Sequence, residues 1–243
     1  MGRIQQIINE FADHKAQLKV LEAGCGSISK VEFPRNTHIT GIDISENQLR
    51  RNTLIDEKIL GDIQYYRFKP KSFDIIISWY VLEHVPRPEL ALKSFAEAIK
   101  EGGLVIFAVP NVFSLKGFIT KFTPHWFHVF IYKYLHGWKD AGKSDIGPFK
   151  AYLRFSIAPL SIKNFARKNG FQIELFSTFD AFNYWVGTSI KEKSKLGYLF
   201  IKNLLAFLKT ISFGKIGDSE FAVVLKKQEA HTVLQEEESL SIS

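Results

Sequence analysis

The stretch "VLEAGCGSIS" (residues 20–29) gives the clearest indication of the fold of this chain. An apolar run leads into the acid Glu22 and then into two glycines, Gly24 and Gly26, one residue apart. This pattern is typical of a buried strand that ends in a tight turn, where glycine lets the backbone approach a ligand without a Cβ clash. The flanking sequence then has to show which sheet holds the strand and which ligand the turn serves.

Strands and helices alternate on both sides of this turn. Continuous runs of Ile and Val, as in "FDIIIS" (73–78), indicate strands that are buried on both faces and hence parallel. The alternation predicts an α/β fold with a doubly wound sheet. The predicted strands are 18–24, 38–45, 73–78, 102–110, 171–179 and 220–227, and the predicted helices are 3–17, 45–55, 86–103 and 158–170.

Composition narrows the class of protein. The chain has 243 residues, 46% of them hydrophobic, which suits one large globular domain. A formal net charge of +7 permits an anionic partner, but the basic residues are spread along the chain, so we expect no nucleic acid. The single cysteine, Cys25, excludes an intramolecular disulfide, and with the absence of a signal-like apolar run it predicts a cytoplasmic setting.

Two further acids stand at strand ends. Asp43 is the last residue of "GID" in the second strand, where a carboxylate can accept hydrogen bonds from both hydroxyls of an adenosine ribose, and Asp62 follows "LG" at a third strand end. The first turn lacks the third glycine that packs a helix against a pyrophosphate in NAD sites. An NAD-dependent oxidoreductase is therefore the less favoured adenosine-binding alternative.

Five segments, taken in order, resemble one family. The segments "VLEAGCGS", "GIDIS", "LGDI", "FDIIISWYVLEHV" and "GGLVIFAVPN" resemble the class I S-adenosylmethionine-dependent methyltransferases, in the small-molecule branch that includes the ubiquinone and menaquinone methyltransferases. The resemblance covers about residues 18–110. It implies an enzyme that uses S-adenosyl-L-methionine and no metal. It also implies a seven-stranded mixed sheet of order 3-2-1-4-5-7-6 whose last strand is antiparallel.

The resemblance also implies a cofactor site at the first two strand ends. Glu22, Gly24 and Gly26 match the motif that cradles the methionine and ribose portions of the cofactor. Asp43 matches the residue that binds the ribose diol, and Ile44 matches the apolar residue that flanks adenine. These five positions are the predicted core of cofactor binding.

Two further strand ends complete the implied site. Asp62 matches the acid that accepts a hydrogen bond from the adenine amino group, with Ile63 beside it. Ser78 and Trp79 end the fourth strand, where the family meets the methionine end of the cofactor. The resemblance therefore places cofactor contacts on four neighbouring strand ends.

Methyl transfer from a sulfonium is an in-line displacement, so the enzyme mainly aligns the reactants and excludes water. An oxygen or carbon acceptor must also lose a proton. The candidate bases are His84 after the fourth strand, and His125 and His128, whose spacing puts them on one face of a helical turn. The alternatives are that His84 only holds its loop, that His125 and His128 pack or bind metal, and that Glu83 anchors the loop.

Two insertions interrupt the regular pattern of the single domain predicted for 1–228. Residues 111–157 are aromatic and basic, and we expect them to form a lid over an apolar pocket. The second insertion, 180–219, contains an amphipathic stretch (191–215) that either packs on the lid or lies at a membrane interface. The acidic tail 229–243 is expected to be disordered. The aromatic residues of the lid are Phe113, Phe118, Phe122, Trp126, Phe127, Phe130, Tyr132, Tyr134 and Trp138.

The predicted function is methyl transfer from S-adenosylmethionine to oxygen or carbon of a small, largely apolar or aromatic acceptor. One alternative is a lipid or quinone methyltransferase held at the inner face of the membrane. A nucleic-acid or protein methyltransferase is less favoured, because "SWYV" stands where base N-methyltransferases often carry an Asn/Asp-Pro-Pro-aromatic motif. The alternative of another class is a non-catalytic S-adenosylmethionine-binding or scaffold protein. The acceptor, the pathway and the oligomeric state are left open.

Overall fold

The computed structural model describes residues 2–134, 137–143, 146–180 and 218–229, together with seven positions between 195 and 210. The amphipathic stretch 191–215 and the tail after residue 229 therefore lie almost wholly outside the described residues, and their predicted roles stay predictions. The same holds for the predicted division into one domain with two insertions. Among the described residues, no helix is long and apolar enough to cross a membrane.

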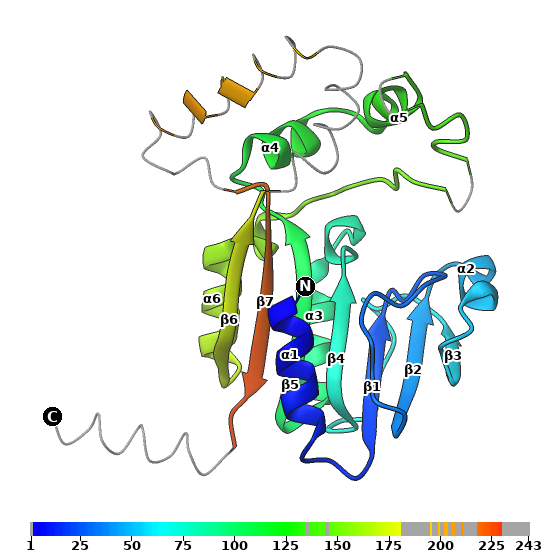
Figure 1. Cartoon of the computed structure of the whole chain (residues 1–243), viewed down its shortest axis with the longest axis vertical. Helices are drawn as coiled ribbons and strands as arrows, with labels where there is room; N and C mark the ends of the chain where they lie inside the picture. Colours follow the sequence, from blue (N-terminus) through cyan, green and yellow to red (C-terminus); the bar gives the residue numbers. More distant parts are fainter. Residues whose placement is uncertain are drawn as a thin grey trace, which may run out of the picture.

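Seven strands form one mixed sheet in the order β3-β2-β1-β4-β5-β7-β6 (Figure 1). Strands β1 to β5 pair in parallel, whereas β7 runs antiparallel to both β5 and β6. The predicted fold class and strand order are confirmed. The strands are β1 (Leu18–Ala23), β2 (Thr37–Asp43), β3 (Glu57–Leu60), β4 (Phe73–Trp79), β5 (Ile99–Pro110), β6 (Phe171–Phe179) and β7 (Glu220–Lys227).

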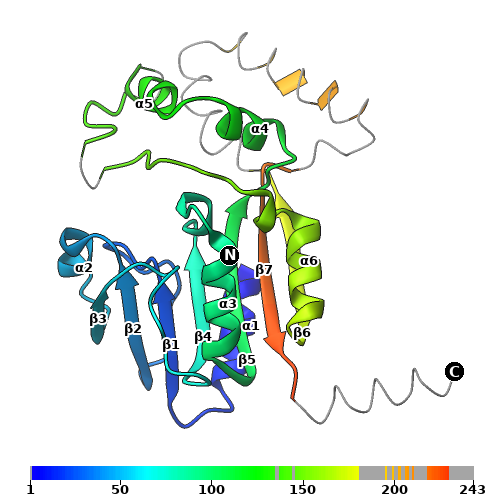
Figure 2. The ribbon, with the colours of Figure 1, turned by 180° about the vertical axis from the view of Figure 1, so that it is seen from behind.

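Helices cover both faces of this sheet. Helix α1 lies against one face, and α3 and α6 lie against the other, as Figures 1 and 2 show from opposite sides. Helices α4 and α5 lie beyond the carboxyl ends of the parallel strands (Figure 1). The helices are α1 (Gly2–Ala12), α2 (Glu46–Arg51), α3 (Pro88–Ala98), α4 (Leu115–Phe122), α5 (His125–Tyr134) and α6 (Pro159–Lys168), with 3-10 turns η1 (Leu82–His84) and η2 (Phe155–Ile157).

The apolar run of β4 shows why the central strands carry no polar alternation. Ile75 and Ile77 pack into the core beneath α1, where they join Ile8, and Ile76 packs into the core beneath α3, where it joins Phe95. All five side chains are buried. Successive side chains of a strand point to opposite faces, so a strand covered by helices on both sides needs an apolar residue at every position.

Two helices end earlier than the sequence pattern predicts. The helix predicted for 3–17 ends at Ala12, and Lys15 forms an ion pair with Asp74, 3.5 Å away, as the chain turns toward β1. The helix predicted for 45–55 ends at Arg51, because the Asn52 side chain donates hydrogen bonds to the carbonyls of the first turn. Long-range contacts thus set both boundaries.

The helix predicted for 86–103 spans only Pro88–Ala98, and β5 begins at Ile99 instead of residue 102. Ile99 pairs with Phe73, and the register then shifts so that Leu104 pairs with Ile75. Gly102 adopts φ +72° inside this irregularity. Gly102, which lies inside the range predicted as a helix, is therefore part of a bulge in the strand.

Candidate active site

A cavity of about 990 Å³ opens at the carboxyl ends of β1, β2 and β4. Open parallel sheets bind ligands at this edge, where the strand order reverses beside the first strand. Three segments supply most of the wall: the turn after β1, the turn into α2, and the loop after β4. The lining residues are 22–30, 43–48, Ile77, Trp79, Tyr80, Val81, His84, Phe149, Lys150 and Tyr152.

The turn after β1 depends on glycine at two positions. Gly24 has φ +75° and Gly26 has φ +55°, a region that other residues rarely adopt. A Cβ on Gly24 would lie 2.5 Å from the Val81 side chain, and one on Gly26 would lie 2.9 Å from Oε1 of Gln48. The two glycines therefore keep the turn tight between the loop after β4 and helix α2.

Asp43 ties this turn to helix α2. Its Oδ2 accepts a hydrogen bond from the Gly26 amide (2.9 Å), and its Oδ1 accepts one from the Ser45 amide (2.9 Å). Ser45 in turn caps α2, because its hydroxyl accepts from the Gln48 amide. The predicted ribose-binding carboxylate is thus fixed in place before any ligand arrives.

Asn52 is a site-supporting residue that sequence reasoning missed. Its side chain is fully buried, and its Nδ2 donates to the carbonyls of Cys25 and Gly26, at 3.3 Å each. It holds the first turn from the side opposite Asp43. A polar residue where a predicted helix should continue was the available signal.

Glu22 adds an acidic group to the cavity wall, and two isoleucines add exposed apolar surface. Glu22 is buried, the Ser29 hydroxyl donates to its Oε2 (2.6 Å), and burial raises the pKa of its carboxyl. Ile28 and Ile44 line the cavity, yet their side chains are 64% and 76% exposed. Such exposed apolar surface beside carboxylates suits a ligand with a flat apolar part and a cationic part.

Only one of the four remaining predicted cofactor residues lines the cavity. Trp79 lines the cavity, whereas Asp62, Ile63 and Ser78 do not. The Asp62 carboxylate accepts hydrogen bonds from the backbone and side chain of Gln64, at 2.8 to 3.0 Å. Ile63 and Ser78 are buried. The structure thus brings six of the nine predicted cofactor residues to one cavity wall, and the roles of the other three stay predictions.

His84 is the predicted base that the structure brings to the cavity. Its ring lies on the cavity wall, and its Nδ1 lies 3.0 Å from the Lys150 carbonyl. A carbonyl only accepts, so Nδ1 carries the proton and Nε2 of the neutral ring is left as the proton acceptor. Burial lowers the pKa of the imidazole, which favours this neutral form.

His125 and His128 do not line this cavity. Both lie on α5, as the spacing predicts, and the Nε2 of His128 lies 2.9 Å from the Thr123 hydroxyl. The described residues contain no group of three or more His, Cys, Asp or Glu side chains that could hold a metal ion. The cavity lining therefore does not support a catalytic role for these two histidines.

The lid contributes to the cavity through one short segment. Phe149, Lys150 and Tyr152 form its wall opposite the turn after β1. This segment is fixed to the loop after β4, because the Tyr152 and Leu153 amides donate to the Glu83 carbonyl at 2.8 and 3.0 Å. None of the nine aromatic residues that the sequence singled out in the lid lines the cavity.

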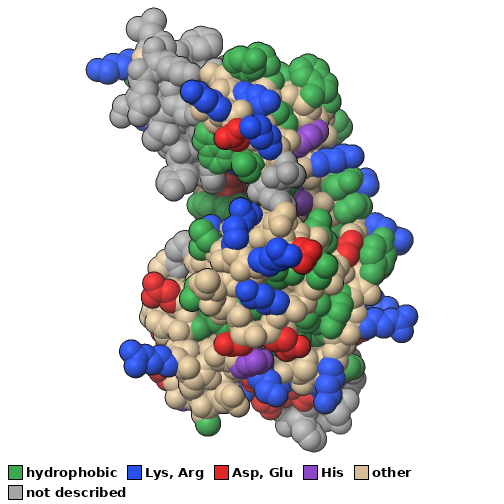
Figure 3. Space-filling model, turned by 90° about the vertical axis from the view of Figure 1, so that its right-hand side faces the viewer, with side chains coloured by type: hydrophobic (Ala, Val, Ile, Leu, Met, Phe, Trp, Pro, Cys, Tyr) green, Lys and Arg blue, Asp and Glu red, His purple; other side chains and the backbone are tan. Residues whose placement is uncertain are grey.

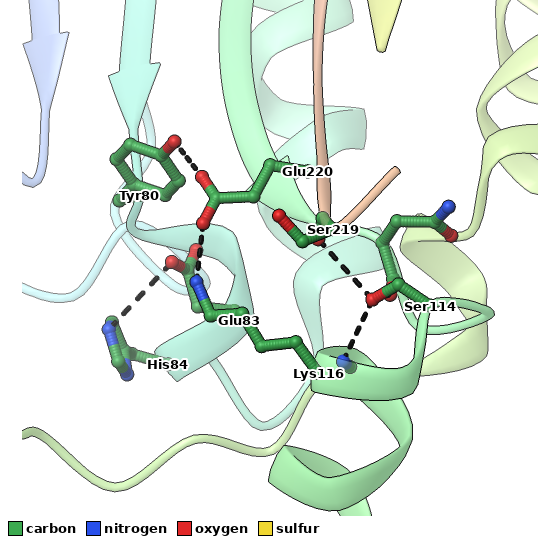
Figure 4. Close-up of polar contacts among 9 residues, drawn as sticks. Tyr80, Glu83, His84, Ser114, Lys116, Ser219 and Glu220 are labelled. Carbon is green, nitrogen blue, oxygen red and sulfur yellow. Dashed lines mark hydrogen bonds and ion pairs between the residues drawn. The ribbon is translucent and has the colours of Figure 1, made fainter. Parts of the chain in front are cut away.

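A buried polar cluster lies directly behind His84 (Figure 4). Glu220 accepts hydrogen bonds from the Tyr80 hydroxyl and the Lys116 ammonium. The Glu83 carboxyl lies beside this group, and its Oε2 has no hydrogen-bond partner among the described residues. Burial raises the pKa of Glu83 to about 8. Sequence reasoning missed this cluster, because its members lie far apart in the chain.

The charged and apolar groups that line the cavity suit S-adenosylmethionine better than NAD. The carboxylates of Glu22 and Asp43 suit a cationic ligand with a ribose diol, and the exposed Ile28 and Ile44 suit an adenine ring. A dinucleotide presents a pyrophosphate to the backbone amides of this turn. Here the Gly26 amide already donates to Asp43, and two carboxylates would face the phosphates.

Known proteins resemble this chain in sequence and in fold. A sequence model of the family "Methyltransferase domain" matches residues 2–175. A ubiquinone biosynthesis O-methyltransferase of Idiomarina loihiensis is 33% identical over 103 residues, 38% of this chain and 42% of that protein. The enzyme of the same name from an Azoarcus species is 27% identical over 165 residues, 64% of each chain. The chain thus spans about half the length of these relatives.

One solved structure shows how far the fold extends. Phosphoethanolamine N-methyltransferase 2 of Haemonchus contortus, in complex with S-adenosyl-L-methionine, aligns with a TM-score of 0.55 over 93% of this chain and 53% of that chain. The two sequences are 17% identical, so this likeness shows the fold alone.

Proposed function

Because the chain belongs to the family of methyltransferase domains, we propose that it transfers the methyl group of S-adenosylmethionine to a hydroxyl oxygen of a small, largely apolar aromatic acceptor. The match to the family model confirms the family, the enzyme class and the cofactor that the sequence predicted. The acceptor, its reacting atom and the roles of individual residues belong to the proposal.

The position of His84 on the cavity wall is the observation that favours a hydroxyl acceptor. A hydroxyl must lose its proton when it attacks the methyl group, and a neutral imidazole in reach is suited to take it. The Lys150 carbonyl fixes the tautomer that leaves Nε2 free for this task. A non-catalytic scaffold would need neither a base on the cavity wall nor a fixed tautomer.

The cavity supports an apolar aromatic acceptor. Ligand sites of small molecules occupy about 300–1,000 Å³, so a cavity of about 990 Å³ has room for a cofactor and a small acceptor together. Beyond the predicted cofactor residues, its wall carries the rings of Tyr80, Phe149 and Tyr152. The names of the two bacterial relatives, both O-methyltransferases of ubiquinone biosynthesis, favour oxygen over carbon.

Calorimetric titration with S-adenosylhomocysteine and with NAD tests the cofactor site directly. We expect binding of S-adenosylhomocysteine and none of NAD, because the turn offers carboxylates instead of free amides. Binding of NAD alone would contradict the assignment. The titration needs no knowledge of the acceptor.

Radiolabelled methyl transfer to phenols tests the acceptor class. We expect transfer to a catechol that carries an alkyl chain, and slower transfer to catechol itself. The His84→Ala variant should lose about 10²–10⁴-fold in kcat, which is the usual contribution of a general base, with unchanged affinity for S-adenosylhomocysteine. The matched control is His14→Ala, whose imidazole is exposed outside the cavity. Equal rates for both variants would remove His84 from the reaction.

A further inference from the structure

We propose that Glu83 is a positioning residue whose carboxylate stabilises the His84 imidazolium formed during methyl transfer. The inference rests on the proposed function, in which His84 takes the proton of the acceptor hydroxyl. It assigns a role to a buried carboxyl whose Oε2 has no hydrogen-bond partner among the described residues.

The geometry places the two side chains together on one rigid turn. Both belong to η1, and the Nε2 of His84 lies 3.9 Å from Oε1 of Glu83. The backbone carbonyl of Glu83 accepts two amides from the lid segment, and Lys150 of that segment holds the other side of the imidazole. The ring therefore lies between a fixed carbonyl and a fixed carboxyl, as Figure 4 shows for the carboxyl side.

Burial of the Glu83 carboxyl costs folding free energy. The residue is 4% exposed, and its Oε2 accepts no hydrogen bond within the described part of the chain. An unsatisfied buried polar atom costs about 1–3 kcal/mol. Unpartnered groups of this kind in folded proteins call for an explanation, and a proton-accepting neighbour on the same turn supplies one.

Charged groups from several elements act on this pair. The Lys116 ammonium on α4 opposes the effect of burial and lowers the pKa of Glu83, whereas burial dominates and raises it to about 8. His125 on α5 acts with burial to lower the pKa of His84. The titratable and charged groups around the pair are Tyr80 after β4, Lys116 on α4, His125 on α5, Asp180 after β6 and Glu220 on β7.

Methyl transfer to a hydroxyl releases one proton, and His84 takes it up. The acceptor oxygen forms a bond to the methyl carbon while the sulfur–methyl bond breaks, and that electron pair stays on sulfur. The hydroxyl proton passes to Nε2 of His84, which becomes an imidazolium. The Glu83 carboxylate keeps its negative charge beside this cation, and the proton leaves to solvent after the product departs.

The pH dependence of the rate follows from this requirement. Glu83 must be ionised, so activity is low below its pKa and rises as the pH increases through about 8. His84 must be neutral, and because burial lowers its pKa, its own limb lies below 6.5. The wild type should therefore show an acid limb near pH 8 in kcat/KM for the cofactor, which reports the free enzyme.

The Glu83→Gln variant tests the inference. Glutamine has the shape of the protonated carboxyl present at pH 7, so we expect the fold and the affinity for S-adenosylhomocysteine to be kept. We expect the limb near pH 8 to disappear and the rate at pH 9 to fall roughly 10- to 100-fold, part of the usual acid–base contribution. The matched control is Glu89→Gln, an exposed carboxylate on α3, which should retain the limb. An unchanged limb in Glu83→Gln overturns the inference.

An NMR titration of the ¹⁵N-labelled His84 imidazole separates this inference from the proposed function. In the wild type the His84 signals should show an inflection near pH 8 as Glu83 ionises, and in Glu83→Gln this inflection should be absent and the pKa of His84 lower still. The measurement needs no acceptor. Failure of methyl transfer with an intact inflection would overturn the proposed function, and loss of the inflection in the wild type would overturn the pairing of Glu83 with His84.

Discussion

At the residue scale, the sequence predicts the conformation of the turn after β1 well, because the constraints on this turn are local. Gly24 and Gly26 are the residues that the positive φ values of this turn require, and Asp43 is the last residue of β2, the strand that pairs with β1. The supporting contacts of Asn52 and Glu83 were not predicted, since both join segments that are distant in the chain: Asn52 contacts the first turn, and the Glu83 carbonyl contacts the lid segment. A sequence pattern shows residue types and their spacing, but it does not show which buried polar atoms form hydrogen bonds or ion pairs.

Replacing Asp43 by alanine should weaken cofactor binding. Charge-assisted hydrogen bonds to a ribose diol contribute about 1.5–3 kcal/mol each, so the Kd for S-adenosylhomocysteine should rise at least tenfold. Asp43→Asn should lie between, because an amide oxygen can still accept from the Gly26 amide. The measurement is calorimetric titration, with the exposed Asp13→Ala as the control. Wild-type affinity in Asp43→Ala would remove this carboxylate from the site.

Replacing Gly24 by alanine should both strain and crowd the turn. The left-handed backbone costs about 1–2 kcal/mol for a residue with a Cβ, and the new Cβ would lie 2.5 Å from Val81. Gly137→Ala is the matched control, since Gly137 has φ +73° and no atom within 4 Å of such a Cβ. Chemical denaturation should show a larger loss for Gly24→Ala, by about 1–3 kcal/mol of overpacking. Equal losses would mean that Val81 moves away freely.

At the element scale, most strands were predicted closely, β3 (Glu57–Leu60) was predicted only through the strand end at Asp62, and the helix ends were not predicted. The ranges predicted for β6 and β7 match the structure, because buried or alternating runs define them. Helix α3 ends early because Ile99 is recruited into β5, a sheet contact that no helical periodicity reveals. Element type thus follows from pattern, whereas element length follows from packing.

Helix α4 depends on a glycine that the sequence analysis did not single out. The Ser114 hydroxyl caps the helix by accepting from the Gly117 amide (2.9 Å), and a Cβ on Gly117 would lie 1.9 Å from the Asn111 carbonyl oxygen. The start of α4 is therefore in close contact with the chain that leaves β5. This contact fixes where the lid begins over the sheet.

The Gly117→Ala variant should push α4 away from the end of β5. Overpacking against backbone costs about 1–3 kcal/mol, so the melting temperature should fall. Gly2→Ala is the control, because Gly2 is also helical and its Cβ would meet nothing within 4 Å. That control should be neutral or slightly stabilised, since alanine favours a helix by about 0.5–1 kcal/mol over glycine. A stabilised Gly117→Ala would contradict the close contact.

At the scale of the whole molecule, the sheet could be predicted, whereas the lid residues that reach the cavity could not. The parallel strands share one topology, which fixes their order and brings the first turn and the acid of β2 to one edge. The aromatic residues of the lid were expected to form the acceptor pocket, but many of them are exposed: Phe118, Phe122, Trp126, Phe130 and Tyr134 among them. Hydrophobic side chains accordingly gather on the upper part of the face in Figure 3. Aromatic content alone does not say which way a side chain points.

Two phenylalanines of the lid, one inside and one outside the cavity lining, allow a test of where the acceptor binds. Phe149 lines the cavity, and its ring packs edge-on against His84 with centroids 5.9 Å apart. Phe118 on α4 is exposed and lies outside the cavity lining. The two residues thus represent the lid segment that reaches the cavity and the lid surface that does not.

Phe149→Ala should raise the KM for the acceptor and leave the affinity for S-adenosylhomocysteine unchanged. The ring is about half buried, so its loss should cost about 1–1.5 kcal/mol, or roughly 5- to 10-fold in KM. Phe118→Ala, the matched control, should leave both quantities as in the wild type. The opposite result, with KM raised by Phe118→Ala alone, would mean that the acceptor meets the exposed aromatic surface of α4. Steady-state kinetics with an alkylated catechol distinguish the two, because only the segment that faces His84 can hold a hydroxyl in reach of Nε2.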